Sequence, residues 1–455
     1  MSLVFNFCRL RSWMVVLSLC VLTSCSQQSY PAEKIKESLT KICRTEYGIE
    51  ELDVQIAGET IGVYLPLKKL FAADFKEAVV TGKVRNLETL FEPSPEALEK
   101  VEDVLFSISR VLLSTDKPFK FYVLEATDIE KTGLQLVLIG YVDDVKRVRL
   151  WDISRNEYRK RVIHELKLNH AVMWHRPVRQ FFKDLSDLPV TEVRKKYFQE
   201  QVPDTVLETL FLFNRPGHLA PKPGEVDWNV LEMRSAQAKK NEILVYARVK
   251  PYGGSYDFSA NTEFAYLFVL SLPEEGAQIT RIIPFQYLND TGQLKKIPFP
   301  KELQIEENLE NWQQEFKLEE VVLGSFLAQQ LTRRVQAMAS GDERIQNTFR
   351  EIKLNFDYHP EAGNPGFSLD LETTLRDFNN YSRDSLIFHE DMLYLLNLAS
   401  REFVDVLRSY QFGDYGYLRL NLAQDPAPRV FGREDLELFR RKKIDFQSLL
   451  SLPKV

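Results

Sequence analysis

Cysteine and glycine are scarce in this chain, and neither sign of charge dominates. Four cysteines among 455 residues are too few for the disulfide framework of a secreted scaffold. Nineteen glycines, about 4% of the chain against a usual ~7%, exclude collagen-like and glycine-rich repeat proteins. Lys and Arg number 59 against 65 Asp and Glu, so the formal net charge is -6. This mildly acidic balance argues against nucleic acid as a partner, and we predict none.

Motifs for common enzyme chemistries are also missing. The sequence has no Gly-x-Ser-x-Gly elbow and no phosphate-binding loop ending in Gly-Lys-Ser or Gly-Lys-Thr. A zinc peptidase helix needs a second histidine four residues after the first, but Leu168 follows His164 and Leu393 follows His389 at that spacing. We therefore predict no catalytic residue, no metal site and no cofactor.

The first residues, by contrast, have a recognisable pattern. Arg9 and Arg11 are the only charges among residues 1–24, and an apolar run follows at residues 13–22. The run is too short for the ~20 residues that cross a bilayer. A basic start followed by a short apolar run predicts a cleaved secretory signal peptide.

Leu22, Thr23, Ser24 and Cys25 come next. An aliphatic residue, two small residues and a cysteine in this order resemble the lipobox of bacterial lipoproteins. The resemblance implies cleavage before Cys25, diacylglycerol on the Cys25 sulfur, and a fatty acyl chain such as palmitate on the new amino group. These chains would suffice for stable membrane anchoring. The resemblance also implies the outer membrane, facing the periplasm, because no inner-membrane retention aspartate follows Cys25.

The rest of the chain is predicted to have an α+β fold in which antiparallel sheets pack against long helices. Apolar residues alternate in some segments and recur at helical spacing in others, which predicts strands and helices respectively. The predicted parts are a signal peptide at 1–24, a tether at 25–30, an N-terminal α+β domain at 31–166, a helical connector at 167–224, a β-meander with a long helix at 225–341, and a C-terminal α+β domain at 342–455.

The order strand, strand, long helix, strand, closing helix is predicted twice, at residues 52–166 and 352–443. Residues 153–155 and 431–433 look alike and precede the two closing helices. These likenesses predict an internal duplication of a β-β-α-β-α unit. The alternative is that two α+β domains share this order by chance.

Three helical segments are predicted between these parts. Ser154 and Glu157 form a capping-box pattern that starts a helix reaching about Leu166. Residues 164–214 have a mostly helical pattern, broken by prolines. One long helix, or two, is predicted at residues 306–339, where apolar residues form a helical stripe.

Basic residues gather near the end of each predicted repeat. The candidate contacts are Lys146, Arg147, Arg149, Arg159 and Arg161 in the first repeat, and Arg440 and Arg441 in the second. Such clusters could pair with the phosphates of anionic lipids or polymers. The alternative is a solvated helix face whose charges are balanced by acids such as Glu157 and Glu434.

Two tyrosines flank a glycine-containing loop after a predicted strand. Tyr252 and Tyr256 could stack on a glycan or a peptide of a partner. The alternative is that both rings fold back onto the β-meander.

Together these patterns predict a lipid-anchored protein of the cell envelope. We predict that it acts without catalysis, as a binding, scaffold or assembly component with a protein or envelope polymer as partner. One alternative is an envelope hydrolase acting on peptidoglycan, polysaccharide or peptide, which would need a cleft with converging titratable groups. Another is a lipid or solute carrier, which would need a large apolar pocket.

Overall fold

The protein was examined as a computed structural model. The residues that the structure describes are 30–72, 92–198, 226–253, 263–272, 278–288, 294–296, 298, 301–303, 305, 308–376, 386–423 and 427–452. Two of the predicted site residues, Cys25 and Tyr256, lie outside these ranges.

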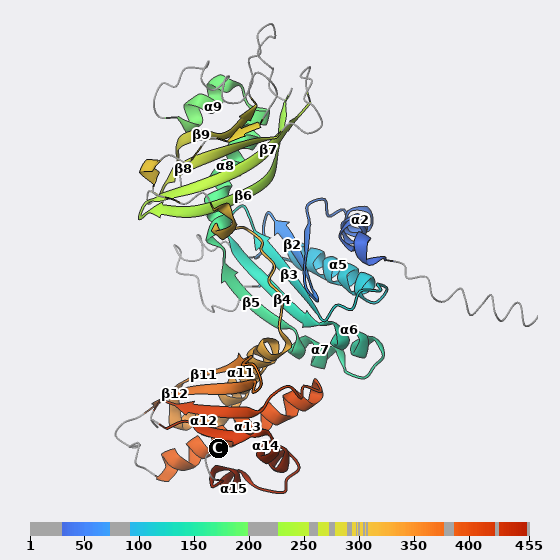
Figure 1. The fold of residues 1–455 in the computed structure, drawn as a ribbon, viewed down its shortest axis with the longest axis vertical. Coiled ribbons are helices and arrows are strands. Elements are labelled where there is room, and N and C mark those ends of the chain that lie inside the picture. Colours follow the sequence, from blue (N-terminus) through green and yellow to red (C-terminus); the bar gives the residue numbers. More distant parts are fainter. Residues whose placement is uncertain are drawn as a thin grey trace, which may run out of the picture. The chain divides into compact units, whose positions relative to one another are not determined.

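The chain divides into two compact units, which are described separately (Figure 1). The first unit comprises residues 1–57, 61–146 and 164–318, and the second comprises residues 58–60, 147–163 and 319–455. Helix α6 (Val142–Arg149) contains the boundary at residue 147. The described strands form two five-stranded sheets and one four-stranded sheet.

The N-terminal sheet of the first unit has the strand order β1-β2-β3-β4-β5. Its elements are η1 (Ala32–Lys34), α2 (Ile35–Tyr47), β1 (Asp53–Ala57), β2 (Thr60–Leu67), α5 (Pro95–Leu112), β3 (Phe121–Asp128), β4 (Leu134–Tyr141) and β5 (Ile163–Leu168). Gly48 ends α2 with a φ of 66°, a conformation that glycine adopts without strain. Ser94 starts α5, because its Oγ accepts a hydrogen bond from the Ala97 amide at 3.2 Å. Helices α2 and α5 pack on each other, and α2 also packs on β1.

The second sheet of the first unit is an antiparallel meander with the order β10-β9-β8-β7-β6. Its elements are α8 (His170–Asp187), α9 (Val190–Tyr197), β6 (Asp227–Lys239), β7 (Glu242–Tyr252), β8 (Phe264–Ser271), β9 (Gln278–Leu288), β10 (Leu294–Lys296), η2 (Lys301–Leu303) and η3 (Leu309–Asn311). Phe181 and Phe182 on α8 each meet the ring of Phe268 edge-on, with 5.5 Å between centroids. These buried rings fix one face of α8 against the meander.

The second unit contains the sheet β11-β12-β13-β14. Its elements are α7 (Arg155–Arg161), α11 (Leu323–Gly341), α12 (Glu343–Thr348), β11 (Phe349–His359), β12 (Gly366–Leu375), α13 (Leu386–Ser409), β13 (Tyr417–Leu422), β14 (Arg429–Gly432), α14 (Arg433–Arg440) and α15 (Phe446–Leu450). Strands β12 and β13 are parallel, with α13 as the crossover between them, and the other pairs are antiparallel. Phe367 on β12 and Phe403 on α13 have ring centroids 5.2 Å apart, so the helix packs on the sheet through aromatic side chains.

Mostly antiparallel sheets with long helices confirm the predicted α+β fold. The predicted repeat has a counterpart in the element order, since β1-β2-α5-β3-β4-α6 corresponds to β11-β12-α13-β13-β14-α14. In the first set Val142 N donates to Lys120 O at 2.8 Å, and in the second Arg433 N donates to Gly416 O at 2.9 Å. A common origin of the two sets stays a prediction.

The predicted match between residues 153–155 and 431–433 is wrong. Residues 431–433 lead directly from β14 into α14, whereas the helix directly after β4 is α6, which begins at Val142. Residues 153–155 precede the next helix, α7. The equivalent positions are therefore the two helix starts at Val142 and Arg433.

Two of the predicted helical segments are partly wrong. The helix that Ser154 caps ends at Arg161, and Ile163–Leu168 forms the edge strand β5, whose backbone pairs within the sheet. The long helix predicted from residue 306 begins only at Leu323. Residues 312–318, which we call the cross-sheet segment, are not helical and form an isolated β-bridge at Gln313 instead.

The cross-sheet segment is held by partners from both sheets of the first unit. Gln313 exchanges two backbone hydrogen bonds with Ser235 on β6, at 2.8 and 2.9 Å. The carbonyl oxygen of Glu315 accepts hydrogen bonds from the side chains of Gln135 and Asn169, at 3.2 and 2.8 Å. These external partners replace the hydrogen bonds that a helix would make within itself, so the segment does not need to be helical.

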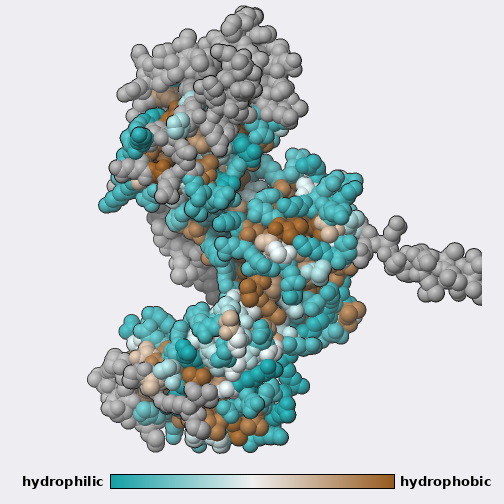
Figure 2. Space-filling view, in the orientation of Figure 1, coloured by the Kyte–Doolittle hydropathy of each residue, from teal (hydrophilic) through white to brown (hydrophobic). Residues whose placement is uncertain are grey.

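The described surface is mainly hydrophilic in the view of Figure 2, with hydrophobic residues in smaller patches. Among the helices of the described part, none is long and apolar enough to cross a membrane. Among the residues that the structure describes, Leu150 and Trp151 have the most exposed large apolar side chains, at 71% and 85%. This pair stands out because its neighbours in sequence are charged.

Candidate functional site

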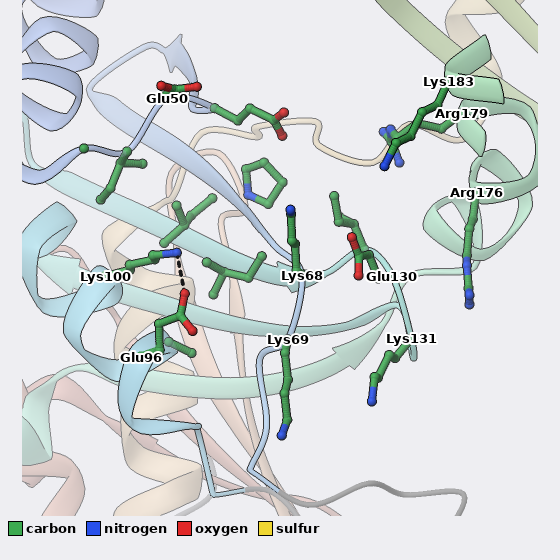
Figure 3. Close-up of a pocket in the computed structure, with 18 of the residues that line it drawn as sticks. Glu50, Lys68, Lys69, Glu96, Lys100, Glu130, Lys131, Arg176, Arg179 and Lys183 are labelled. Carbon is green, nitrogen blue, oxygen red and sulfur yellow. Dashed lines mark hydrogen bonds and ion pairs between the residues drawn. The ribbon is translucent and has the colours of Figure 1, made fainter. Parts of the chain in front are cut away.

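A cavity of about 1050 Å³ lies in the first unit, where the N-terminal sheet meets α8 (Figure 3). The basic residues that line it are Lys68, Lys69, Lys100, Lys131, Arg176, Arg179 and Lys183. The acidic residues that line it are Glu50, Glu51, Glu96 and Glu130. Basic residues thus outnumber acidic ones here, although the whole chain has a net charge of -6. We call this site the basic cavity.

One wall of the basic cavity comes from the end of β2 and the turn between β3 and β4. Lys68 and Lys69 directly follow Leu67, the last residue of β2. The Leu67 carbonyl accepts a hydrogen bond from Ile129 N at 3.0 Å, which holds the turn carrying Lys131 beside them. Figure 3 shows Lys68 and Lys69 extending in opposite directions from the strand end.

Helix α8 supplies the facing wall. Arg176, Arg179 and Lys183 recur at spacings of three and four residues, so they share one face of the helix. The other face is buried on the meander, which fixes the rotation of α8. In Figure 3 the side chains of Arg179 and Lys183 extend from α8 toward the strands.

Arg179 forms an ion pair with Glu315 of the cross-sheet segment. Its Nη2 donates to Glu315 Oε1 at 2.7 Å. The same carboxylate accepts hydrogen bonds from His175 Nδ1 at 3.0 Å and from the Tyr64 hydroxyl at 3.0 Å. His175 Nε2 in turn lies 3.0 Å from Ser235 Oγ. These contacts join both sheets of the first unit to one carboxylate.

The charge states in this network follow from burial and partners. Burial opposes ionisation of Glu315, but the hydrogen bond from His175 and the charge of Arg179 outweigh it and lower its pKa to about 2. Burial lowers the pKa of His175, although the Glu315 hydrogen bond acts in the opposite direction. A neutral His175 that donates from Nδ1 and accepts at Nε2 from Ser235 satisfies all these contacts.

Most of the remaining cations of the basic cavity have no protein partner in the described part of the chain. Lys100 pairs with Glu96 at 2.8 Å. No described residue makes a salt bridge or hydrogen bond with the charged groups of Lys68, Lys69, Arg176 and Lys183. The cavity is therefore suited to phosphate or carboxylate groups, which accept charge-assisted hydrogen bonds from lysine and arginine.

Catalytic chemistry has little support at this site. The described lining contains no His, Cys, Ser, Thr or Tyr, so it offers neither a hydroxyl or thiol nucleophile nor an imidazole base. Within the residues that the structure covers, no group of three His, Cys, Asp or Glu side chains could hold a metal ion.

A carboxyl suited to acid-base chemistry occurs on β3 rather than in the basic cavity. Burial raises the pKa of Glu125 to about 7, and the charge of Lys167 acts in the opposite direction. A carboxyl that titrates near neutrality can serve as a general acid or base. Lys167 is the single charged group that affects the pKa of Glu125 among the described residues.

The predicted basic contacts of the first repeat are largely engaged with the protein itself. Lys146 pairs with Asp143 at 2.7 Å, and Arg147 donates to the Ser409 carbonyl at 3.3 Å. Arg161 is buried and pairs with Glu157 at 2.9 Å. The last two members of this set, Arg149 and Arg159, have exposed side chains.

In the second repeat, Arg440 and Arg441 share one acidic partner. Glu437 Oε2 lies 2.8 Å from Arg440 Nη2 and 3.5 Å from Arg441 Nε. Glu437 therefore balances the charges of Arg440 and Arg441, whereas the sequence predicted Glu434 in this role. Taken together, the seven predicted cations do not form one open basic face.

Tyr252 lies at the end of β7 and is 44% exposed. The ammonium group of Lys250 sits 5.4 Å from the centre of its ring, a cation–π contact. A stacking role for Tyr252 stays a prediction, and its proposed companion Tyr256 is among the residues that are not described.

The chain was compared with family models, curated proteins and solved structures. No match was found in any of the three. The function must therefore be argued from the site itself.

The basic cavity was not predicted from the sequence. One signal was present, since Arg176, Arg179 and Lys183 have the spacing of one helix face. The adjacent lysines Lys68 and Lys69 also follow a predicted strand. Nothing in the sequence indicates that these two groups meet, because more than 100 residues separate them.

Proposed function

We propose that this chain is a lipid-anchored, non-catalytic binding protein of the bacterial cell envelope, and that it holds an anionic ligand in the basic cavity. The anchor rests on the lipobox pattern that ends at Cys25. The binding activity rests on one observation, the convergence of lysine and arginine side chains on a large cavity in an acidic protein.

The ligand class follows from the size and lining of the cavity. A volume of about 1050 Å³ is at the upper end of ordinary small-molecule sites, so it can hold a segment larger than a single ion. The cations fit phosphate or carboxylate groups, while the four glutamates could accept hydrogen bonds from hydroxyl groups. An envelope polymer that combines sugar hydroxyls with phosphate or uronate groups has both features.

The charged lining also argues against the carrier alternative. A lipid carrier needs an extended apolar cavity, because transferring acyl chains out of water is its driving force. Among the described residues, the apolar side chains that line the basic cavity are those of Ile49, Leu65, Leu67, Ala97 and Ile129, together with Pro66.

The proposal is tested with the chain lacking residues 1–24 and carrying Cys25→Ser, so that no lipid is attached. Calorimetric titration with a poly(glycerol phosphate) and with a polyuronate oligosaccharide should show binding that weakens as salt is added. A neutral glucan oligosaccharide of equal length should not bind. Equal binding of the neutral glucan would exclude the electrostatic argument.

The variant for this test is Lys68→Gln, Arg176→Gln, Lys183→Gln, which leaves the Arg179–Glu315 pair intact. We expect binding at least about tenfold weaker, because three charge-assisted contacts are lost. The matched control is Arg159→Gln, Lys160→Gln, which removes exposed charges in the second unit. An unchanged affinity in the cavity variant would remove the site from consideration.

A further inference from the structure

Figure 1 shows the loop between α6 and α7. Two apolar side chains of this loop are exposed to solvent. Leu150 is 71% exposed and Trp151 is 85% exposed. Both belong to the second unit. Exposed leucine is common in soluble proteins, but a nearly fully exposed tryptophan beside it is unusual and suggests a contact with a partner surface.

The backbone at Trp151 makes this exposure more informative. Asp152 N donates to Arg147 O at 2.8 Å and Trp151 N lies 3.4 Å from Val148 O, the pattern of a Schellman helix end. Trp151 occupies the left-handed position of that motif with a φ of 64°. Glycine is the favoured residue there, and a bulky side chain is strained. Glycine at position 151 would therefore be less strained than tryptophan, so local backbone stability does not explain the indole.

Both flanks of the loop are anchored within the second unit. On one side Arg147 donates to the Ser409 carbonyl at 3.3 Å. On the other side Arg161 pairs with Glu157 and places its guanidinium 5.0 Å from the ring centre of Tyr410. The helices on both sides of the loop are thus held in place, so burying Leu150 and Trp151 would not require these helices to rearrange.

The exposed charges that follow the pair in sequence are mainly positive. Arg155, Arg159 and Lys160 on α7 are exposed, and their charged groups make no salt bridge or hydrogen bond with any described residue. Asp152 is the exposed acid next to the pair. This cationic rim contrasts with the net charge of -6 for the whole chain.

We propose that Leu150 and Trp151 insert into the interfacial region of an anionic bilayer while Arg155, Arg159 and Lys160 contact its phosphate groups. Tryptophan and leucine with nearby cations are the usual composition of interfacial membrane contacts. Two apolar side chains are too small a patch for a stable protein interface, which buries ~1,000 Å² or more. They suffice as a second, weak signal beside another anchor. The contact does not depend on the basic cavity or on its ligand.

The test uses the same non-lipidated chain with unilamellar vesicles. One set contains phosphatidylcholine alone, and the other contains equal parts of phosphatidylglycerol and phosphatidylcholine. We expect co-sedimentation with the anionic vesicles alone, a blue shift of tryptophan emission, and quenching by brominated phospholipid. Trp228 and Trp312 are buried, at 8% and 6% exposure, and Trp174 is partly buried against the meander. The shift is therefore assigned to Trp151 by its loss in a Trp151→Phe variant.

Three variants separate the contributions. Trp151→Phe should still sediment but lose most of the quenching, because phenylalanine keeps the apolar contact. Trp151→Gly fits the backbone and should sediment about tenfold less, as expected when an aromatic side chain no longer leaves water. Arg155→Gln, Arg159→Gln, Lys160→Gln should lose the preference for anionic vesicles.

The cavity variant Lys68→Gln, Arg176→Gln, Lys183→Gln is the matched control and should sediment like the parent. Equal sedimentation of the Trp151→Gly variant and the parent would overturn the proposal, as would equal binding to both kinds of vesicle. An absence of binding to either vesicle would also overturn it and would direct the search for the occupant of this loop to proteins.

Discussion

The buried carboxylate of Glu315 gives the sharpest test of the structure of the first unit. Three donors converge on it, namely Tyr64, His175 and Arg179. A glutamine at this position keeps the shape of the side chain but replaces one acceptor oxygen by an NH₂ group. In Glu315→Gln the NH₂ group faces either the Tyr64 hydroxyl, which must then accept instead of donate, or the N–H donors of His175 and Arg179. In both orientations Arg179 loses its counter-charge.

The size of the effect follows from the pKa of Glu315, which is lowered from 4.5 to about 2. A shift of about 2.5 pKa units corresponds to about 3 kcal/mol of stability at pH 7. Because the pKa is depressed in the folded state, this contribution is complete above the unfolded value of 4.5 and decreases as the pH falls toward 2. It should decline to about 2 kcal/mol at pH 3.5.

The assay is urea unfolding of the non-lipidated chain at pH 7 and at pH 3.5, monitored by tryptophan emission. Trp228 and Trp312 are buried in the first unit, so they report on its unfolding. We expect Glu315→Gln to be less stable than the parent by about 3 kcal/mol at pH 7, with a smaller difference at pH 3.5. The control Glu310→Gln removes an exposed carboxylate from the same unit and should leave stability within about 0.5 kcal/mol.

Two outcomes would refute the reasoning. A difference between Glu315→Gln and the parent that is equal at both pH values would mean that packing, and not ionisation, determines the effect. A stability equal to that of the parent at pH 7 would mean that the three donors do not depend on the charge of Glu315.

Three further predictions concern other parts of the chain. Burial raises the pKa of Glu125 to about 7, so the folded state loses stability as the pH rises from 4.5 through 7. Urea unfolding should therefore show that Glu125→Gln is more stable than the parent by about 3 kcal/mol at pH 8 and equally stable at pH 4. Gly62→Ala should destabilise the chain by about 1–3 kcal/mol, because the added Cβ would lie 2.6 Å from the Leu318 side chain and 2.8 Å from the Phe316 side chain. The control in the same thermal unfolding experiment is Gly341→Ala, whose Cβ would meet no atom within 4 Å. Cys25→Ser should abolish metabolic labelling with palmitate, whereas processing that is insensitive to globomycin would contradict the lipoprotein prediction.

Local signals in the sequence were sufficient for many element ends. Ser94 with Pro95 predicted the start of α5, and Gly48 predicted the end of α2. Ser154 predicted the start of α7, where its Oγ accepts a hydrogen bond from Glu157 N at 3.1 Å. These predictions hold because each depends on interactions among residues a few positions apart.

The errors occurred where long-range contacts decide the conformation. Residues 163–168 join a sheet edge, and the neighbouring strand that stabilises them cannot be inferred from their own pattern. Residues 312–318 have apolar positions that also fit a helix. Their non-helical form depends on remote partners such as Gln55, whose Oε1 accepts from Leu318 N at 3.1 Å. The spacing of apolar residues within a segment does not reveal a hydrogen bond to a side chain more than 250 positions away.

The candidate sites divide in the same way. The lipobox that ends at Cys25 is a contiguous motif, and the α+β class follows from local periodicity, so both could be predicted from the sequence alone. The basic cavity exists because a strand end, a turn and a helix face from distant parts of the chain converge. The exposure of Leu150 and Trp151 likewise depends on how the flanks of their loop pack. Local chemistry thus determined many of the elements and carries the prediction of a leader, whereas tertiary packing decided which charges and apolar groups are exposed.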